Sequence, residues 1–328
     1  MIRSLFSAVS GLTSMQEAMD VIGNNIANVD TDGFKASDTE FSEAFSQTER
    51  EADESDPIGL DVGLGVRVTG TVTNFSQGAF ETTSIPSNVA ISGNGFFVIN
   101  TSESQATGAG TGTTLYSRAG DFTVNNEGYL MTADGYYVMG YSAGSTGSAA
   151  EPDTTNTEAT GFSGGTIYSD FSASAGTSLS GGQLTAIQIP TVIQEETFNP
   201  STNTYTAGTT TAVASYSVSS TGAITVVGED GTNAIIGYLS LATFPSNDGL
   251  NSEGAGYYTQ TQASGAPSIS TPGEGEAGNV QGGAVELSNS DVATEFSDMI
   301  IIQNGYSANA KVITVSNEML ETADNLIQ

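Results

Sequence analysis

The side chains in this sequence that could carry out chemistry are almost all carboxylates. There are 37 Asp and Glu residues, and neither His nor Cys occurs. His is the commonest general base and Cys supplies thiolate nucleophiles, disulfides and most zinc sites, so these chemistries are excluded. Hydrolysis of glycosides needs only a pair of carboxylates and is the enzymatic alternative that survives. No motif selects such a pair, and the sequence predicts a protein that is not an enzyme.

The segment GNNIANVDTDGF (residues 23–34) contains, from Asn28 onward, residues typical of the first half of a calcium-binding loop. Oxygen ligands at the first, third and fifth positions and glycine at the sixth would come from Asn28, Asp30, Asp32 and Gly33. The twelfth position, which needs a bidentate Glu, is Thr39, and Lys35 lies inside the loop. The pattern therefore predicts no metal and no other cofactor. The alternative is that these residues end a helix, because Asn, Asp and Gly tolerate left-handed backbone conformations.

The charge of the chain is strongly negative. Six Lys and Arg against 37 Asp and Glu give a formal net charge of -31. This charge argues against binding to nucleic acid or to an anionic membrane surface. The cations are Arg3, Lys35, Arg50, Arg67, Arg118 and Lys311. A solvated acidic surface explains the pattern, and adaptation to high salt is the alternative.

No part of the sequence predicts insertion into a membrane. A membrane-spanning helix needs about 20 mainly apolar residues, and the sequence contains no such run. The first residues, MIRSLFSAVSGLTSM, are interrupted by Ser and Thr where a signal peptide needs a continuous apolar region. We therefore expect no cleaved signal peptide, so secretion of this chain would need another route.

Apolar residues at seven-residue spacing predict long helices at both ends of the chain. Near the start, Leu5, Leu12, Met19 and Ile26 predict a helix over residues 3–28. Near the end, the series is Val285, Val292, Met299, Tyr306, Ile313, Leu320 and Ile327. It predicts a helix of about 40 residues, roughly 60 Å long at 1.5 Å per residue. The N-terminal helix can cover part of this stripe, and other copies of the chain are the candidates for the rest.

Between the helical ends, the sequence predicts strands and turns. Runs of β-branched and aromatic residues, interrupted by turn sequences such as Asn-Gly, occupy residues 88–100, 115–141, 184–193 and 214–244. The predicted fold class is α+β, with terminal coiled-coil-like helices and nested, mainly antiparallel β domains. The predicted domains are a terminal helical domain (1–30 and 286–328), a linking segment (31–75), a β domain (76–142 and 213–285) and an inserted outer β domain (143–212).

Gly23, Asn24 and Asn25 lie just before the predicted end of the first helix. Gly is unfavourable inside a helix, and paired Asn residues gain nothing there. A small residue and two amides suit close contact with a neighbouring subunit, because an amide donates and accepts hydrogen bonds without carrying charge. We therefore predict an interaction surface at these residues, with simple helix capping as the alternative.

Several longer segments resemble those of bacterial flagellar axial proteins. They are SLFSAVSGL, MDVIGNNIANVDTDGFK, FSQGAFETTSIPSNVAISGNGFFVI, YSRAGDFTVNNEGYL and SNSDVATEFSDMIIIQNGYSANAKVITVSNEML. The resemblance covers residues 1–141 and 214–328, with the segments in the same order. Within this rod and hook family the chain is most similar to hook proteins. The alternative is a distal rod protein; rod proteins of this family are similar but shorter chains that lack much of the inserted sequence.

The resemblance implies a structural role. Hook subunits assemble into a curved extracellular tube that transmits motor torque to the filament. By resemblance, Leu5, Leu12, Met19 and Ile26 would pack against Met299, Tyr306, Ile313 and Leu320, and Asn24, Asn25 and Asn28 would contact neighbouring subunits. Implied partners are other copies of the chain, the rod, hook-cap and hook–filament junction proteins, and the type III export apparatus. An acidic surface adhesin is the rival class, and it would be expected to lack the terminal heptads.

Overall fold

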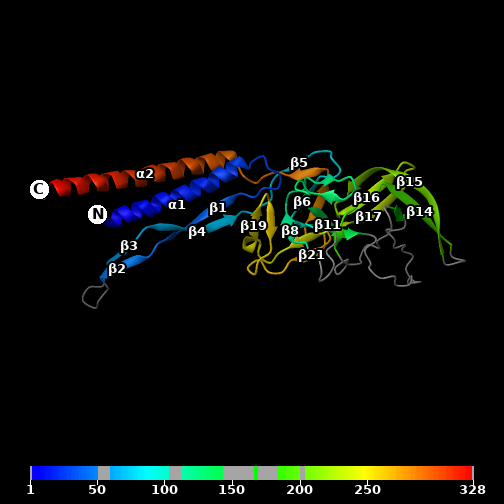
Figure 1. Cartoon of the computed structure of the whole chain (residues 1–328), viewed down its shortest axis with the longest axis horizontal. Coiled ribbons are helices and arrows are strands. Elements are labelled where there is room, and N and C mark those ends of the chain that lie inside the picture. The colour runs from blue at the N-terminus through cyan, green and yellow to red at the C-terminus, as the bar shows by residue number, and fades with distance from the viewer. Residues whose placement is uncertain are drawn as a thin grey trace. The chain divides into compact units, whose positions relative to one another are not determined.

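The computed structural model has a helix at each end of the chain and strands between them (Figure 1). This arrangement confirms the predicted α+β class. The structure describes residues 2–50, 60–102, 112–142, 166–168, 184–199 and 204–326. The chain divides into two compact units. Unit 1 is Met1–Thr31, Lys35–Ser76 and Ser288–Gln328, and unit 2 is Asp32–Phe34 and Gln77–Leu287.

Unit 1 contains both helices and a long pair of strands. Its elements are α1 (Ile2–Ala27), β1 (Ser37–Glu43), β2 (Ser46–Arg50), β3 (Leu60–Gly63), β4 (Val66–Thr73) and α2 (Val292–Asn325). Strand β1 pairs with β4 and β2 pairs with β3, both antiparallel. The Ala44 N–H donates to the Gly65 carbonyl and the Leu64 N–H to the Phe45 carbonyl, so one pairing continues into the other. We call β1–β4 the ribbon; it occupies most of the predicted linking segment.

The C-terminal helix is shorter than its heptad pattern predicts. It spans 34 residues, whereas the spacing predicts about 40. Val285 does not belong to it: this residue lies buried in β23 (Ala284–Glu286), which pairs with β5 (Phe80–Thr82). The Asp291 carboxylate accepts a hydrogen bond from the Ala293 N–H at 2.8 Å. This cap satisfies a backbone donor of the first turn and fixes the start of the helix after Val285.

Unit 2 is built from short strands. They are β5, β6 (Val89–Ser92), β7 (Phe96–Asn100), β8 (Thr114–Ser117), β9 (Thr123–Val124), β10 (Leu130–Met131), β11 (Tyr137–Ser142), β12 (Thr166–Tyr168), β13 (Thr185–Ala186), β14 (Val192–Asn199), β15 (Thr204–Val218), β16 (Ala223–Gly228), β17 (Asn233–Leu239), β18 (Leu241–Thr243), β19 (Asn251–Gly254), β20 (Tyr257–Thr259), β21 (Ser268–Ser270), β22 (Asn279–Gly282) and β23, with a 3-10 turn at Asn247–Gly249. The four predicted strand regions are thus confirmed.

One sheet joins most of these strands. Its order is β12-β14-β15-β16-β17-β11-β7-β8-β20-β19, and its other strands attach to β7 and β11 directly or through one another. The pairs along this order are antiparallel except that β12 runs parallel to β14. Of the predicted insertion, residues 143–165, 169–183 and 200–203 lie outside the described residues. Strand β15 runs without interruption through the predicted boundary at residue 212.

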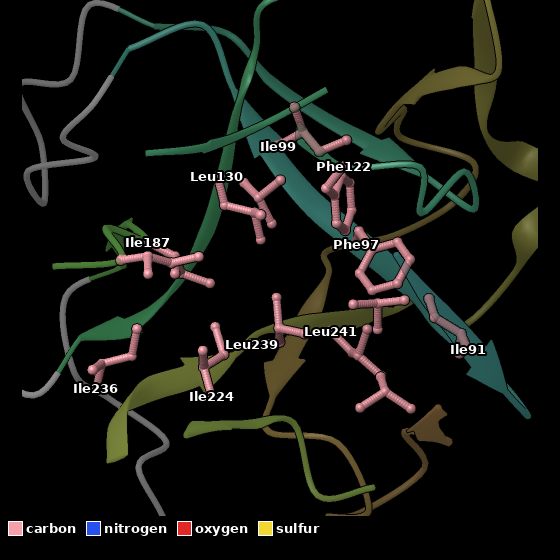
Figure 2. Packing of buried hydrophobic residues seen from close by; sticks show 14 of the residues in the cluster. Ile91, Phe97, Ile99, Phe122, Leu130, Ile187, Ile224, Ile236, Leu239 and Leu241 are labelled. Atoms are coloured by element: carbon pink, nitrogen blue, oxygen red, sulfur yellow. The ribbon is translucent and has the colours of Figure 1, made fainter. Parts of the chain in front are cut away.

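The core of unit 2 lies around β7. Every residue of β7 is buried, because apolar side chains cover the strand on both faces. The Phe97 and Phe122 rings meet edge to face with their centres 5.0 Å apart. Figure 2 shows Leu239 and Leu241, from β17 and β18, among the same apolar cluster. This core holds together strands that are far apart in the sequence.

A buried ion pair lies beside this core. The Arg118 Nη1 and Glu286 Oε2 atoms are 3.3 Å apart, and the two side chains are 3% and 0% exposed. Arg118 also donates to the Gly93 carbonyl, and Glu286 accepts from the Gly78 N–H. Burial lowers the pKa of Arg118, and the nearby Glu286 carboxylate opposes that shift. The pair therefore ties β23 to the segment after β8 and to the chain before β5.

We expect Arg118→Met to lower the free energy of unfolding by about 3–5 kcal/mol, because it removes the cation from a buried carboxylate. Adding Glu286→Gln should recover part of this loss, since Gln keeps an acceptor for Gly78. Urea unfolding measures both variants. Arg67→Met removes an exposed cation and should change stability by no more than about 0.5 kcal/mol. Equal losses in Arg118→Met and Arg67→Met would contradict the expectation.

Candidate functional site

The contact between α1 and α2 brings the two ends of the chain together (Figure 1). A methyl group placed on Gly11 would lie 2.5 Å from Asn309 Nδ2. The Asn25 side chain donates to Glu295 Oε1 at 3.1 Å. Moving forward along α1 from Gly11 to Asn25 thus corresponds to moving backward along α2 from Asn309 to Glu295. The helices pack antiparallel, at a distance that Gly11 permits.

The buried face of α1 consists mainly of small and polar residues. These are Ala8, Gly11, Ser14, Ala18, Ile22 and Asn25. Ser14 donates to the Val66 carbonyl, and Ser10 accepts from the Val66 N–H, so the ribbon also packs on α1. We define this set as the contact face. The heptads of large apolar residues do not predict most of this face, although a spacing of three or four residues among small ones carries the same signal.

The predicted heptad residues lie beside the contact face. On α1, Leu5, Leu12, Met19 and Ile26 are half-buried. On α2, Met299 and Ile313 are half-buried, while Tyr306 is 39% and Leu320 40% exposed. The packing of the α1 heptad residues on those of α2 stays a prediction. Much of this apolar surface is open to solvent within one chain.

Asn25 connects three elements of unit 1. Its side chain is 1% exposed. The Nδ2 atom donates to the Ser37 carbonyl and to Glu295, and the Oδ1 atom accepts from the Ser37 N–H at 3.0 Å. Burial raises the pKa of Glu295, and the negative charges of Asp38 and Asp298 raise it further. The hydrogen bond from Asn25 opposes this rise. Asn25 therefore joins α1, β1 and α2 within one chain.

A second amide, Asn289, ties the same end of the ribbon, where β1 begins and β4 ends. Its Oδ1 atom accepts from the Ala36 N–H at 2.8 Å, and its Nδ2 atom donates to the Asn74 carbonyl at 2.7 Å. Lys35, which is 2% exposed, donates to the Ser76 carbonyl at 2.7 Å. One of the six cations thus serves internal structure. No spacing signal in the sequence marks Asn289 or Lys35 for these roles.

The other residues of the Asn-rich segment face outward. Asn24 is exposed, and a methyl group on Gly23 would meet nothing within 4 Å. The Asn28 amide donates to the Asn24 carbonyl, and the Thr31 hydroxyl donates to the Asn28 side chain. Asn28 thus stabilises the end of α1, as the capping alternative predicts. Gly23 and Asn24 remain available for the predicted contact with a neighbour.

The Asp32–Gly33 step enters unit 2. Gly33 has a φ of 68°, and a methyl group there would lie 2.4 Å from the Ala119 nitrogen. Its N–H donates to the Glu286 carbonyl. The pKa of Asp32 is raised by burial and then by the negative charges of Asp121 and Glu81. Gly33 therefore allows a tight contact with the Ala119 backbone, and the neighbouring Asp32 carboxyl group is costly to ionise.

Across the described ranges, no group of three or more acidic side chains is placed to hold a metal ion. Within the same ranges, no helix combines the length and the apolar character needed to cross a membrane.

Large exposed apolar side chains concentrate on unit 1 among the described residues. On α1 and the ribbon they are Phe6, Val9, Phe41, Phe45, Leu64 and Val72, and on α2 they are Val292, Phe296, Ile300, Ile301, Tyr306, Val312, Val315, Met319, Leu320 and Leu326. Unit 2 contributes only Phe80, Ile85 and Val124 from the part of the chain described. Exposed apolar surface of this extent marks an interaction site.

Comparison with known proteins assigns the family. The model "Flagella basal body rod protein" matches residues 5–35, "Flagellar hook protein FlgE/F/G D1 domain" matches residues 90–226, and "Flagellar basal body rod FlgEFG protein C-terminal" matches residues 281–326. The flagellar basal-body rod protein FlgG of Bacillus subtilis is 32% identical over 99% of both chains. The chain belongs to the flagellar rod and hook family. The matched ends contain most of α1 and all of α2.

Other relatives in the rod and hook family carry both names. The rod protein FlgG of Agrobacterium fabrum is 31% identical over 97% of this chain and 96% of its own. The hook protein FlgE of Treponema pallidum is 27% identical over 99% of this chain and 100% of its own. The family is therefore established, and both rod and hook proteins resemble this member along its length.

We expect Asn25→Ala to destabilise unit 1 by about 2–3 kcal/mol, because it leaves the half-buried Ser37 backbone groups and Glu295 without their partner in the buried Asn25 side chain. Amide hydrogen exchange at Ser37 and thermal unfolding measure the effect. The neighbouring exposed amide gives a matched control: Asn24→Ala should change stability by no more than about 0.5 kcal/mol. Similar effects of the two substitutions would show that Asn25 has no special role.

We expect Asp32→Asn to stabilise unit 2 at neutral pH. Because the pKa of Asp32 is raised in the folded state, the folded chain holds this proton more tightly than the unfolded chain, and stability falls as pH rises above the ordinary Asp value. The advantage of the variant should disappear at pH values below that ordinary value, where Asp32 is protonated in both states. Urea unfolding across pH measures this, with Asp30→Asn as the exposed control. A variant no more stable than wild type at pH 7 would contradict it.

Proposed function

We propose that this chain is a non-catalytic structural subunit that polymerises with copies of itself into the axial tube of the bacterial flagellum. In this role it transmits motor torque, either in the curved hook, which acts as a universal joint, or in the distal rod. The observation that carries the proposal is the apolar surface left open along α1, α2 and the ribbon. Such surface is unfavourable in water and favours burial between subunits.

The hook and the distal rod each have support. The hook placement is supported by the full-length similarity to the Treponema hook protein and by the predicted insertion at residues 143–212. The distal rod placement is supported by the higher identities to rod proteins. It is also supported by the alignment to the Bacillus rod protein, which spans 333 positions against 470 for the Treponema hook protein. A chain of 328 residues needs few gaps in the first alignment and many in the second.

The proposed plan of the subunit follows the nested domains. The terminal segments 1–30 and 286–328 form the inner wall of the tube, the linking segment follows, and the β domain and its insertion lie outside. The proposed partners are copies of the chain and adjoining rod, hook-cap and hook–filament junction proteins. Export through the flagellar type III apparatus would bring the chain to the outside of the cell. The paired ends of the chain in unit 1 are consistent with this plan.

Electron microscopy of the concentrated, purified chain tests the proposal. We expect tubes whose yield rises with ionic strength, because subunits of charge -31 repel one another and salt screens exposed charges beyond about 10 Å at 0.1 M. Curved tubes would assign the hook, and straight tubes the distal rod. Absence of tubes at every salt concentration would overturn the proposal and favour the adhesin alternative.

A further inference from the structure

A second apolar stripe runs along α2, separate from its contact with α1. Its members, which we call the outer seam, are Ile301, Ala308, Val312, Val315, Met319 and Leu326. All are exposed: the terminal members Ile301 and Leu326 are 66% and 86% exposed, and Val312, Val315 and Met319 between them are 43%, 49% and 44% exposed. Successive members are seven, four, three, four and seven residues apart. This spacing is typical of a helix that packs against another helix. The outer seam therefore fits a helical partner.

The outer seam lies to one side of the face that α2 turns toward α1. The face of α2 toward α1 includes Glu295, Gly305 and Asn309, and Ser316, 2% exposed, lies in line with them. Ala308 and Val315 each precede a residue of that face by one position, and one position turns an α-helix by roughly 100°. The outer seam thus borders one side of the helix pair.

The opposite side of the pair carries the predicted heptad residues. On α1, Leu12 and Met19 each follow a contact-face residue by one position. On α2, Tyr306 likewise follows Gly305, which faces Met15 of α1. The helices are antiparallel. A residue one position after the contact on α1 and a residue one position after the contact on α2 therefore lie on the same side of the helix pair. We call this side the paired flank; it comprises Leu5, Leu12, Met19, Ile26, Met299, Tyr306, Ile313 and Leu320, all half-buried or exposed.

Charge distinguishes between the surfaces that a second copy could offer to the outer seam. The described part of α2 has five acids, Glu295, Asp298, Glu318, Glu321 and Asp324, and one cation, Lys311. Two α2 helices face to face would bring these acids together, and like charges in contact are unfavourable. The ribbon is acidic as well, because its strands carry Asp38, Glu40, Glu43, Glu49 and Asp61 against only Arg50 and Arg67. Helix α1 has only Glu17 and Asp20 beside Arg3, which makes its side of the pair the least repulsive surface.

We propose that the outer seam of one copy packs on the paired flank of the next, with α1 as its main partner. The inference rests on the proposed polymer and names the surfaces that build it. The two surfaces differ and lie on opposite sides of one helix pair, so the contact is head to tail. A repeated head-to-tail contact generates a ring or a helical array, whereas a self-complementary contact stops at a dimer.

Single-cysteine cross-linking tests the proposal, because the natural chain has no cysteine. Tubes are grown from wild-type chains with a minority of Val315→Cys copies and of Leu5→Cys, Leu12→Cys or Met19→Cys copies, and are then treated with a short bis-maleimide. The three α1 positions are seven residues apart, or about 10 Å, so together they sample the register of Val315 along most of α1. We expect a mixed product with at least one α1 variant.

Other products would overturn the proposal. A product between two Val315→Cys copies would mean that α2 meets α2, and a product of Val315→Cys with Phe45→Cys would mean that the outer seam meets the ribbon. Intact tubes without any mixed product above the background of Val124→Cys, an exposed position of unit 2, would also overturn it. Failure of wild-type chains to form tubes would instead count against the proposed function.

Discussion

The close antiparallel contact of α1 with α2 is the interaction on which unit 1 depends. Gly11 lies against Asn309, Gly305 lies against the Met15 side chain, and the small residues Ala8 and Ala18 are buried on the contact face of α1. A contact made by small residues buries little apolar area per residue, so it leaves the large apolar side chains on the flanks. One chain therefore completes a narrow helix pair and still carries exposed apolar surface on its flanks.

Polar side chains inside the molecule set the positions of its segments. Asn25 and Asn289 use neutral amides to hold the ribbon, and amides tolerate burial because each donor and acceptor can be matched. In unit 2, Arg118 and Glu286 do the same with opposite charges. In a chain with so few cations, the burial of Lys35 and Arg118 leaves even less positive charge on the surface.

The surface combines two opposing tendencies. Negative charge keeps subunits apart, whereas the apolar flanks of unit 1 favour their association. Because charge repulsion is screened by salt and apolar burial is not, the balance depends on the medium as well as on the chain. A structural polymer benefits from this arrangement, since subunits stay soluble while they are dilute and associate when they are concentrated.

The sequence by itself determined the α+β class, the two terminal helices, the strand regions and the family, because heptad spacing, turn residues and long motifs are local signals. It did not determine where α2 begins, since Val285 fits a heptad and a strand equally well, and the Asp291 cap decides between them. Only the tertiary structure revealed the contact face and the roles of Asn25 and Lys35. Burial and hydrogen bonding depend on which distant segments meet, and residue spacing does not encode that.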